Sequence, residues 1–346
     1  MSFLDRRFGE QAGLGLFLLV SGALLLLAVG AGTGIGEMSI PVDTTFFAVT
    51  NRLGWTSVAL DPIHQSVIWD YRLSRALVAA CCGAGLALCG AILQSLLRNS
   101  LAEPYVLGVS AGASTGAVAI IILGFGAGTV TLSAGAFVGA FASFIFVAML
   151  SDGARAGAGK TILAGVAASQ LFNALTSYVV STSGNAQQAR DIMFWLLGSF
   201  GGVRWPEFQL VLVVVVIGFV VCMYFAKALD AFAFGDDAAA SLGIPVDAVR
   251  VILFAVTALL TATIVSMVGS IGFVGLVVPH AARFIIGPSH SRLLPTCAVT
   301  GAIFMVLADI ISRVILPQQV LPIGVVTALV GVPFFSIILY RSQRAS

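Results

Sequence analysis

One string in the 346-residue sequence could bind a nucleotide, because residues 154–161 read ARAGAGKT. It resembles a phosphate-binding loop, whose backbone N–H groups cradle phosphates while a lysine reaches the terminal ones. However, Ala154 stands where that motif has its first glycine, and a working loop joins a strand to a helix. Here the string joins two apolar stretches, so we expect Arg155 and Lys160 to anchor helix ends at lipid headgroups instead.

The cysteines and histidines show no catalytic or metal-binding pattern. The five cysteines lie in apolar stretches without a CxxC spacing, which predicts buried free thiols. They are Cys81, Cys82, Cys89, Cys222 and Cys297. His64 and His290 stand alone, and no serine or glutamate is spaced to pair with a histidine. We therefore expect neither a catalytic site nor a metal site.

Four polar residues in the apolar stretch 161–182 recur at spacings of three and four. They are Gln170, Asn173, Ser177 and Ser181. This spacing places them on one face of a helix. A polar stripe in an apolar helix either lines a pathway through the membrane or forms hydrogen bonds with a neighbouring helix, and both interpretations stay open.

One acidic residue, Asp309, lies near the end of another apolar stretch. A carboxylate at the centre of a bilayer costs roughly 2.5–3.5 kcal/mol on insertion scales. Arg313 follows one helical turn later, so the sequence predicts an ion pair between these two side chains.

The composition of the chain indicates whether water or lipid surrounds it. Hydrophobic residues make up 59% of the chain and charged residues 9%, against roughly 25% charged in soluble domains. So few charges cannot cover a soluble particle, and lipid must surround most of the chain. The net charge of +2 and the lack of a basic run exclude nucleic-acid binding.

The membrane spans can be counted from the uncharged stretches, since about 20 apolar residues cross a hydrocarbon core about 30 Å thick. The long stretch 251–279 is split at Gly269 and the glycines that follow it, because glycine weakens a helix. The segment 192–203 is too short to cross and is assigned as a partial or interfacial helix. Ten spans result: 14–34, 76–97, 105–125, 129–150, 161–182, 208–226, 251–268, 271–286, 293–312 and 320–340.

Loop charges set the direction of the spans. Ten spans place both termini on one side, and with the termini inside, the 17 lysines and arginines divide eleven inside to six outside. The positive-inside rule then favours cytoplasmic termini. We expect one transmembrane domain over 1–346, with an external segment 35–70 and a cytoplasmic segment 229–247.

Several strings in the chain resemble the FecCD/BtuC-like permease family of ABC importers for iron–siderophores, haem and vitamin B12. They are RLSR at 72–75, the block 83–114, LAGVAASQLFNAL at 163–175, WLLGSFGGVRW at 195–205, GDDAAASLGIPV at 235–246, GSIGFVGLVVPHAAR at 269–283, and LADIISR with LPIGVVTALVGVPFF within 307–335. Two positions depart from the family pattern. Family members commonly have Asn-Pro where this chain has Asn99-Ser100, and an acidic residue where this chain has Val320.

The resemblance implies an all-α, type II ABC importer permease fold in the bacterial inner membrane. It also implies a second permease subunit, forming a homodimer, two cytoplasmic ATPase subunits, and a periplasmic or lipid-anchored substrate-binding protein. ATP would be used by the partner ATPase, and this chain would bind no cofactor and be no enzyme. A ferric siderophore is the commonest substrate in this family and is therefore the expected one, with haem or cobalamin as alternatives.

The resemblance also assigns roles to particular residues. Arg72, Arg75 and Arg313 match the arginines that dock acidic residues of the binding protein, although such arginines could instead extend to the lipid interface. In the segment 235–246, a short helix would fit a groove on the ATPase. Its candidate contacts are Gly235, Ala239, Leu242 and Gly243, and a solvated connection is the alternative.

An ion-coupled secondary transporter is the main alternative function, because ten helices and midspan glycines suit that class as well. Such carriers often need titratable groups deep in the membrane. The clearest spans of this chain carry no Asp, Glu, Lys or Arg at their deep positions, which argues against ion coupling.

Overall fold

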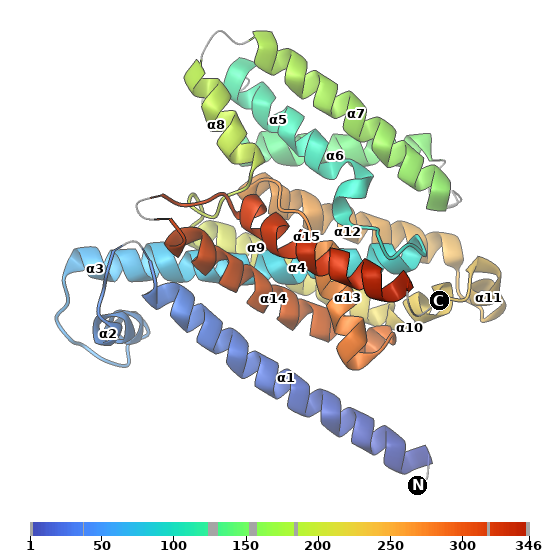
Figure 1. Cartoon of the computed structure of the whole chain (residues 1–346), viewed down its shortest axis with the longest axis horizontal. Coiled ribbons are helices and arrows are strands. Elements are labelled where there is room, and N and C mark those ends of the chain that lie inside the picture. Colours follow the sequence, from blue (N-terminus) through green and yellow to red (C-terminus); the bar gives the residue numbers. More distant parts are fainter. Residues whose placement is uncertain are drawn as a thin grey trace.

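The computed structural model describes residues 3–36, 38–123, 131–151, 158–182, 186–316 and 319–343, which form helices and no β-strand (Figure 1). In this part of the chain, seven helical stretches are long and apolar enough to cross a membrane, and three shorter apolar helices accompany them. Together these helices match the ten predicted spans. The predicted all-α fold is therefore confirmed.

The helices are numbered in chain order. They are α1 (Phe3–Gly34), α2 (Val42–Arg52), α3 (Pro62–Ser66), the π-helix η1 (Val67–Leu73), α4 (Ser74–Leu96), the 3₁₀-helix η2 (Pro104–Leu107), α5 (Val109–Leu123), α6 (Leu132–Leu150), α7 (Ala158–Thr182), α8 (Ala186–Leu196), α9 (Trp205–Tyr224), α10 (Ala226–Phe232), α11 (Asp236–Ser241), α12 (Val246–Val268), α13 (Val274–Ile286), α14 (His290–Val314) and α15 (Ile323–Gln343).

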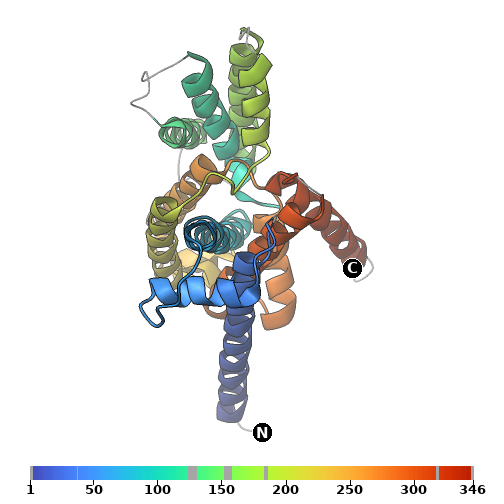
Figure 2. The ribbon, with the colours of Figure 1, turned by 90° about the vertical axis from the view of Figure 1, so that its left-hand side faces the viewer.

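Helix α4 lies at the centre of the bundle, where Figure 2 shows it nearly end-on with other helices around it. It packs against α9, α12, α13 and α14. With α3 and η1 it forms one continuous helical stretch of 35 residues, Pro62–Leu96, of which the most apolar window is 94% buried. The helix therefore begins at Pro62, well before residue 76 where the predicted span starts, and the charged residues between these positions are helical.

Glycines permit α4 to approach its neighbours closely. A Cβ atom at Gly90 would lie 1.8 Å from the carbonyl oxygen of Gly275 in α13, and one at Gly83 would lie 2.1 Å from that of Gly301 in α14. Apolar attraction between helices is weak in lipid, so close backbone packing has to supply much of the association energy. These glycines therefore act in helix packing, as their position within the spans suggests.

The predicted split of stretch 251–279 is confirmed. Helix α12 ends at Val268, Gly269 adopts a left-handed backbone with φ +75°, and α13 begins at Val274. Thirteen residues of α13 extend about 20 Å, which is shorter than a hydrocarbon core of about 30 Å. The residues before α13 must therefore cover part of the membrane depth without helical hydrogen bonds.

Three further segments add detail to the predictions. The span predicted over 105–125 starts as η2, and α5 begins only at Val109, because Gly108 is left-handed with φ +69° and ends the 3₁₀ turn. The segment 35–70 contains α2 and α3, whose Ala48 packs with Ile40 and Ile68 in a small apolar cluster. The short helix expected near 192–203 is α8, which lies earlier in the chain.

We predict that Gly90→Val destabilises the protein. Its side chain would overlap the backbone of α13, and overpacking of a tight interface costs about 1–3 kcal/mol. Thermal unfolding of the purified protein in detergent measures the effect. Gly30→Val is the matched control, since no atom lies within 4 Å of a Cβ there. Equal melting temperatures for both variants would contradict the packing role of Gly90.

Candidate functional sites

A buried ion cluster lies where α4 begins. Arg75 Nε donates to Asp309 Oδ1 at 2.9 Å, and Arg75 Nη2 forms an ion pair with the same oxygen at 2.7 Å. Arg313 Nη2 lies 3.1 Å from Asp309 Oδ2, an ion pair without hydrogen-bond geometry. Asp309 is only 1% exposed. The predicted pair of Asp309 with Arg313 is confirmed. The sequence analysis did not predict that Arg75, which lies 234 residues from Asp309 in the chain, also pairs with it.

Two of these arginines also hold the chain that leaves α1. Arg72 Nη1 donates to the Gly34 carbonyl at 2.9 Å, and Arg313 donates to the carbonyls of Ile35 and Gly32 at 2.8 and 3.0 Å. The last carbonyls of a helix have no partner within it, so these guanidinium groups satisfy the end of α1.

The three arginines predicted to dock a partner therefore lie together, but they are buried and bonded within this chain. Arg72, Arg75 and Arg313 line a cavity of about 430 Å³ together with Arg204, whose guanidinium carbon lies 4.3 Å above the ring of Tyr71. Extension of the three arginines to the lipid interface does not occur. Direct contact with a binding protein stays a prediction.

The segment 229–247 lies at the opposite end of α4 (Figure 1). It contains the predicted short helix, α11, bounded by Gly235 with φ +103° and Gly243 with φ +81°. Leu242 is 73% exposed and free to contact a partner, whereas Ala239 is fully buried. The assignment of Ala239 as a contact residue is therefore corrected, since its methyl group supports α11 from inside.

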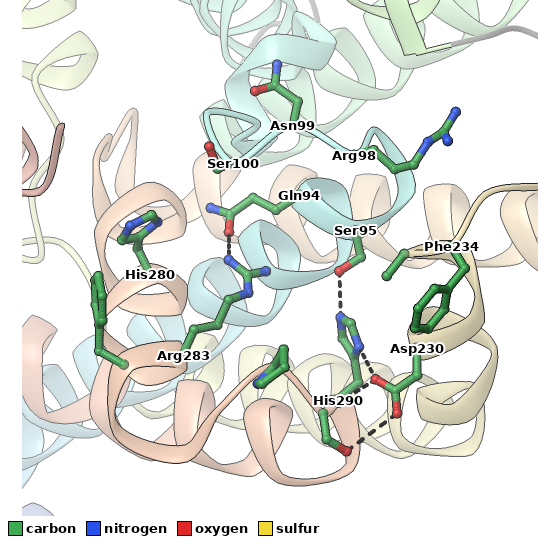
Figure 3. Close-up of a pocket in the computed structure, with 14 residues that line it drawn as sticks. Gln94, Ser95, Arg98, Asn99, Ser100, Asp230, Phe234, His280, Arg283 and His290 are labelled. Carbon is green, nitrogen blue, oxygen red and sulfur yellow. Dashed lines mark hydrogen bonds and ion pairs between the residues drawn. The ribbon is translucent and has the colours of Figure 1, made fainter. Parts of the chain in front are cut away.

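A cavity of about 680 Å³ lies beside this segment, between the end of α4, α10, α13 and the start of α14 (Figure 3). On its wall, Arg283 donates to Gln94 Oε1, and Gln94 Nε2 donates to the Gly275 carbonyl at 3.1 Å. These contacts fix the end of α4 against α13.

A second network on the same wall joins three helices. His290 Nε2 lies 2.5 Å from Ser95 Oγ, and its Nδ1 lies 2.6 Å from Asp230 Oδ1, which also accepts the His290 backbone N–H at 2.8 Å. We call Ser95, Asp230 and His290 the histidine clasp. It ties α10, which precedes the predicted coupling helix α11, to α4 and α14 (Figure 3).

The histidine clasp corrects the expectation that no serine pairs with a histidine, because the fold brings together residues that are 195 positions apart. Its order of groups is that of a hydrolytic triad, which also requires donors for an oxyanion. In this chain, two backbone N–H groups that follow Ser95 already have acceptors. Those of Arg98 and Asn99 donate to carbonyls of the last turn of α4, so they are not available to an oxyanion. The geometry therefore supports a structural connection between helices.

Within the described part of the chain, the polar stripe of α7 forms no hydrogen bond with a neighbouring helix. Its four residues, Gln170, Asn173, Ser177 and Ser181, are exposed in the single chain. The interhelical hydrogen bonds of α7 come from Thr176, whose Oγ1 lies 2.9 Å from Thr115 Oγ1 of α5, and from the Phe172 carbonyl. Ser181 donates to the Tyr178 carbonyl of its own helix at 2.8 Å, so the described residues give the stripe no interhelical bonding role, and its place on a transport pathway stays a prediction.

The remaining sequence predictions have simple outcomes. The five cysteines are free, four are buried and Cys81 is half-buried. Residues 154–157 of the nucleotide-like string lie outside the described residues, and Ala158–Thr161 form the first turn of α7. No group of three or more potential metal ligands occurs among the residues that were described.

A family model described as the FecCD transport family matches residues 24–341. The cobalamin import system permease protein BtuC of Halobacterium salinarum is 37% identical over 333 residues, covering 93% of this chain and 87% of that protein. The molybdate import system permease protein MolB of Haemophilus influenzae is 32% identical over 331 residues, covering 94% and 96%. A solved inward-facing metal-chelate type ABC transporter has a TM-score of 0.82 and 30% identity, covering 94% of this chain and 99% of that one. The fold that the motifs implied is confirmed.

We predict that Asp309→Asn strongly destabilises the fold. The change leaves two buried guanidinium groups without their counter-charge, and breaking a buried pair costs about 3–5 kcal/mol. Thermal unfolding in detergent measures the loss. Asp237→Asn is the control, because Asp237 is exposed at the start of α11. A melting temperature for Asp309→Asn that matches the control would contradict a structural role for the cluster.

We predict that His290→Ala loosens α10 and α11. The change removes the imidazole's hydrogen bond to the Asp230 carboxylate, worth about 1.5–3 kcal/mol, and its contact with Ser95, while the backbone N–H of residue 290 can still donate to Asp230. Hydrogen exchange of residues 226–241 should accelerate by about tenfold or more, since 1.4 kcal/mol corresponds to a factor of ten. His64→Ala, at the other end of the bundle, should leave that segment unchanged. Unaltered hydrogen exchange in His290→Ala would show that the histidine clasp does not stabilise α10 and α11.

Proposed function

The chain belongs to the FecCD transport family of ABC importer permeases, and from this premise we propose that it carries an organic metal chelate across the bacterial inner membrane. The observation that carries the proposal is a family match over almost the whole chain, on a helical bundle that presents an exposed short helix at one end. A ferric siderophore is the leading substrate, with haem or cobalamin as alternatives. The relatives are named for different substrates, cobalamin and molybdate, so they support the class of importer more than any one substrate.

We propose that α11 receives the motion of a partner ATPase. Leu242 and Phe234 expose most of their side chains on either side of α11, and a short helix with exposed apolar groups suits a groove on a partner. Arg250 pairs with Asp236 at 2.6 Å and the histidine clasp holds α10, so a push on α11 would reach α12, α14 and α4. This arrangement requires segment 229–247 and both termini to face the cytoplasm.

We propose that the binding protein docks at the opposite end, over the arginine-lined cavity. Arg75 and Arg313 are buried, and Asp309 neutralises part of their charge. These two arginines would therefore contribute to the shape and positive charge of the docking surface from beneath it. Arg204 also lines this cavity and is only partly buried. Acidic side chains of a partner would meet a positive potential there, which steers association. A second copy of this chain, completing a homodimer, would supply the other half of the pathway.

An ion-coupled carrier is less well supported. The acidic side chain of α14, Asp309, is buried and paired with two arginines. Both of its oxygens face guanidinium groups of this chain, which indicates a structural role and not that of an ion-coupling carboxylate. The proposal of an ATP-driven importer does not need such a group.

Reconstituted vesicles test the function. We predict that uptake of chelate requires ATP, the partner ATPase and the binding protein, and that Leu242→Ala lowers uptake about tenfold because it truncates an exposed apolar contact. Leu19→Ala is the matched control, since Leu19 is 74% exposed on α1, far from α11.

Two results would contradict these assignments. Uptake by this chain alone, driven by an ion gradient, would exclude the importer. Equal uptake by Leu242→Ala and Leu19→Ala would exclude α11 as the ATPase contact.

A further inference from the structure

Helix α2 runs across the bundle and not along it. In Figure 1 it is seen end-on while α4 is seen along its length, and in Figure 2 the two views are exchanged. It contacts α1, α3 and η1. The apolar span of α1, Gly15–Gly34, ends close to α2, and only 17% of its most apolar window is buried, so most of this span faces lipid. Helix α2 therefore lies at the level where hydrocarbon gives way to lipid headgroups.

One face of α2 is apolar and mostly exposed. Val42, Phe46, Val49 and Leu53 recur at spacings of four, three and four, which places them on one side of a helix. The side chain of Val42 is 82% exposed and that of Phe46 is 60% exposed. A different face, that of Ala48, holds the helix to the bundle. The apolar face is therefore turned away from the small cluster in which Ala48 packs.

The chain after α2 presents a tryptophan on a well-ordered turn. Trp55 is 76% exposed, yet its backbone N–H donates to the Thr50 carbonyl at 2.9 Å. Asn51 fixes the residues that follow, because its Nδ2 donates to the Val58 carbonyl at 2.7 Å and its Oδ1 accepts from Thr56 Oγ1 at 2.7 Å. The exposed indole is therefore held in place by a turn whose polar groups are bonded.

The exposed apolar side chains of α2 and its turn need a cover other than water. A contiguous apolar patch on a protein marks contact with another protein or with a membrane. A binding protein would have to leave the permease to collect its substrate, whereas lipid lies beside α1 at all times. Indole rings favour the boundary between hydrocarbon and headgroups, and helices with one apolar face lie in the plane of that boundary. Lipid is therefore the occupant that fits this face.

The charges of α2 indicate how it would meet the lipid. The helix carries one acidic residue, Asp43, in its first turn and one basic residue, Arg52, in its last turn. Interfacial helices that depend on anionic lipids are rich in lysine and arginine on their polar face. Because the two charges of α2 balance, its contact with lipid would depend on the burial of apolar side chains and not on the charge of the headgroups.

We propose that α2 and the turn at Trp55 insert their apolar side chains into the lipid interface of the leaflet farther from α11. This inference goes beyond the proposed function and does not depend on which molecule is transported. Helix α2 contacts η1, which carries Arg72 of the arginine-lined cavity. Insertion of α2 therefore fixes the height of that cavity relative to the membrane surface, at the level that a docking partner has to reach.

Spin labels on introduced cysteines test the position of α2 in lipid nanodiscs. Phe46→Cys and Leu53→Cys place a label on the apolar face, and both residues are exposed, so the fold should tolerate the change. Thr44→Cys is the matched control, because Thr44 is a half-buried residue of the same helix and lies on the other side from Phe46. The unsubstituted protein, whose five cysteines are free and mostly buried, gives the baseline.

We predict that the accessibility to oxygen, which dissolves in lipid, relative to that of a water-soluble nickel chelate is several-fold higher at Phe46→Cys and Leu53→Cys than at Thr44→Cys. The contrast should be the same in discs of phosphatidylcholine and of phosphatidylglycerol, since α2 has no net charge. Equal ratios at the three sites would overturn the proposal. A contrast seen only in phosphatidylglycerol would also overturn it, because headgroup charge would then hold the helix.

Two other occupants of this face would give different results. If a binding protein covers it, the label at Phe46→Cys is open to the nickel chelate until that protein is added. If a second copy of the chain covers it, the labels of two copies in one disc broaden each other's spectra. Either result would overturn the contact with lipid. The measurement needs neither ATP nor substrate, so its outcome is independent of the proposed transport function.

Discussion

The close approach of α4 to α13 and α14 is the constraint on which the rest of the structure depends. In lipid, apolar side chains gain little by leaving their surroundings for a neighbouring helix, so backbone contact must replace hydrophobic burial as the source of association. Gly83 and Gly90 bring α4 within touching distance of two carbonyl groups. These contacts fix the rotation of α4 and its shift along its own axis relative to its neighbours. They thereby also fix the positions of the polar side chains on α4.

Polar networks hold each end of this central helix, and they differ in kind. At one end the carboxylate of Asp309 is shared by two arginines, all three being nearly inaccessible to water. Breaking such a group leaves uncompensated charge, so it behaves as a rigid joint. At the other end the histidine clasp connects α4 to α10 through hydrogen bonds of modest net energy. The end of α4 near α10 and α11 is therefore held less strongly than the end at Asp309.

The interruption between α12 and α13 follows from the same packing. Gly275 can approach α4 only because its neighbours leave the helix that α12 would otherwise continue. Tyr105 bonds both the N–H and the carbonyl of Ile271 in this unwound segment, which lies beside a cavity lined by residues of α8 and α15.

The sequence by itself determined the number of spans, the split at Gly269, the helix α11 and the pair of Asp309 with Arg313, because each depends on hydrophobic length, on backbone preference or on neighbours one turn apart. Only the tertiary structure decided that Arg75 joins Asp309, that His290 meets Ser95, and that the three predicted docking arginines lie inside the protein. Contacts between helices depend on how each helix is rotated and shifted against its neighbours. That geometry arises from many close backbone contacts together, and no single stretch of residues specifies it.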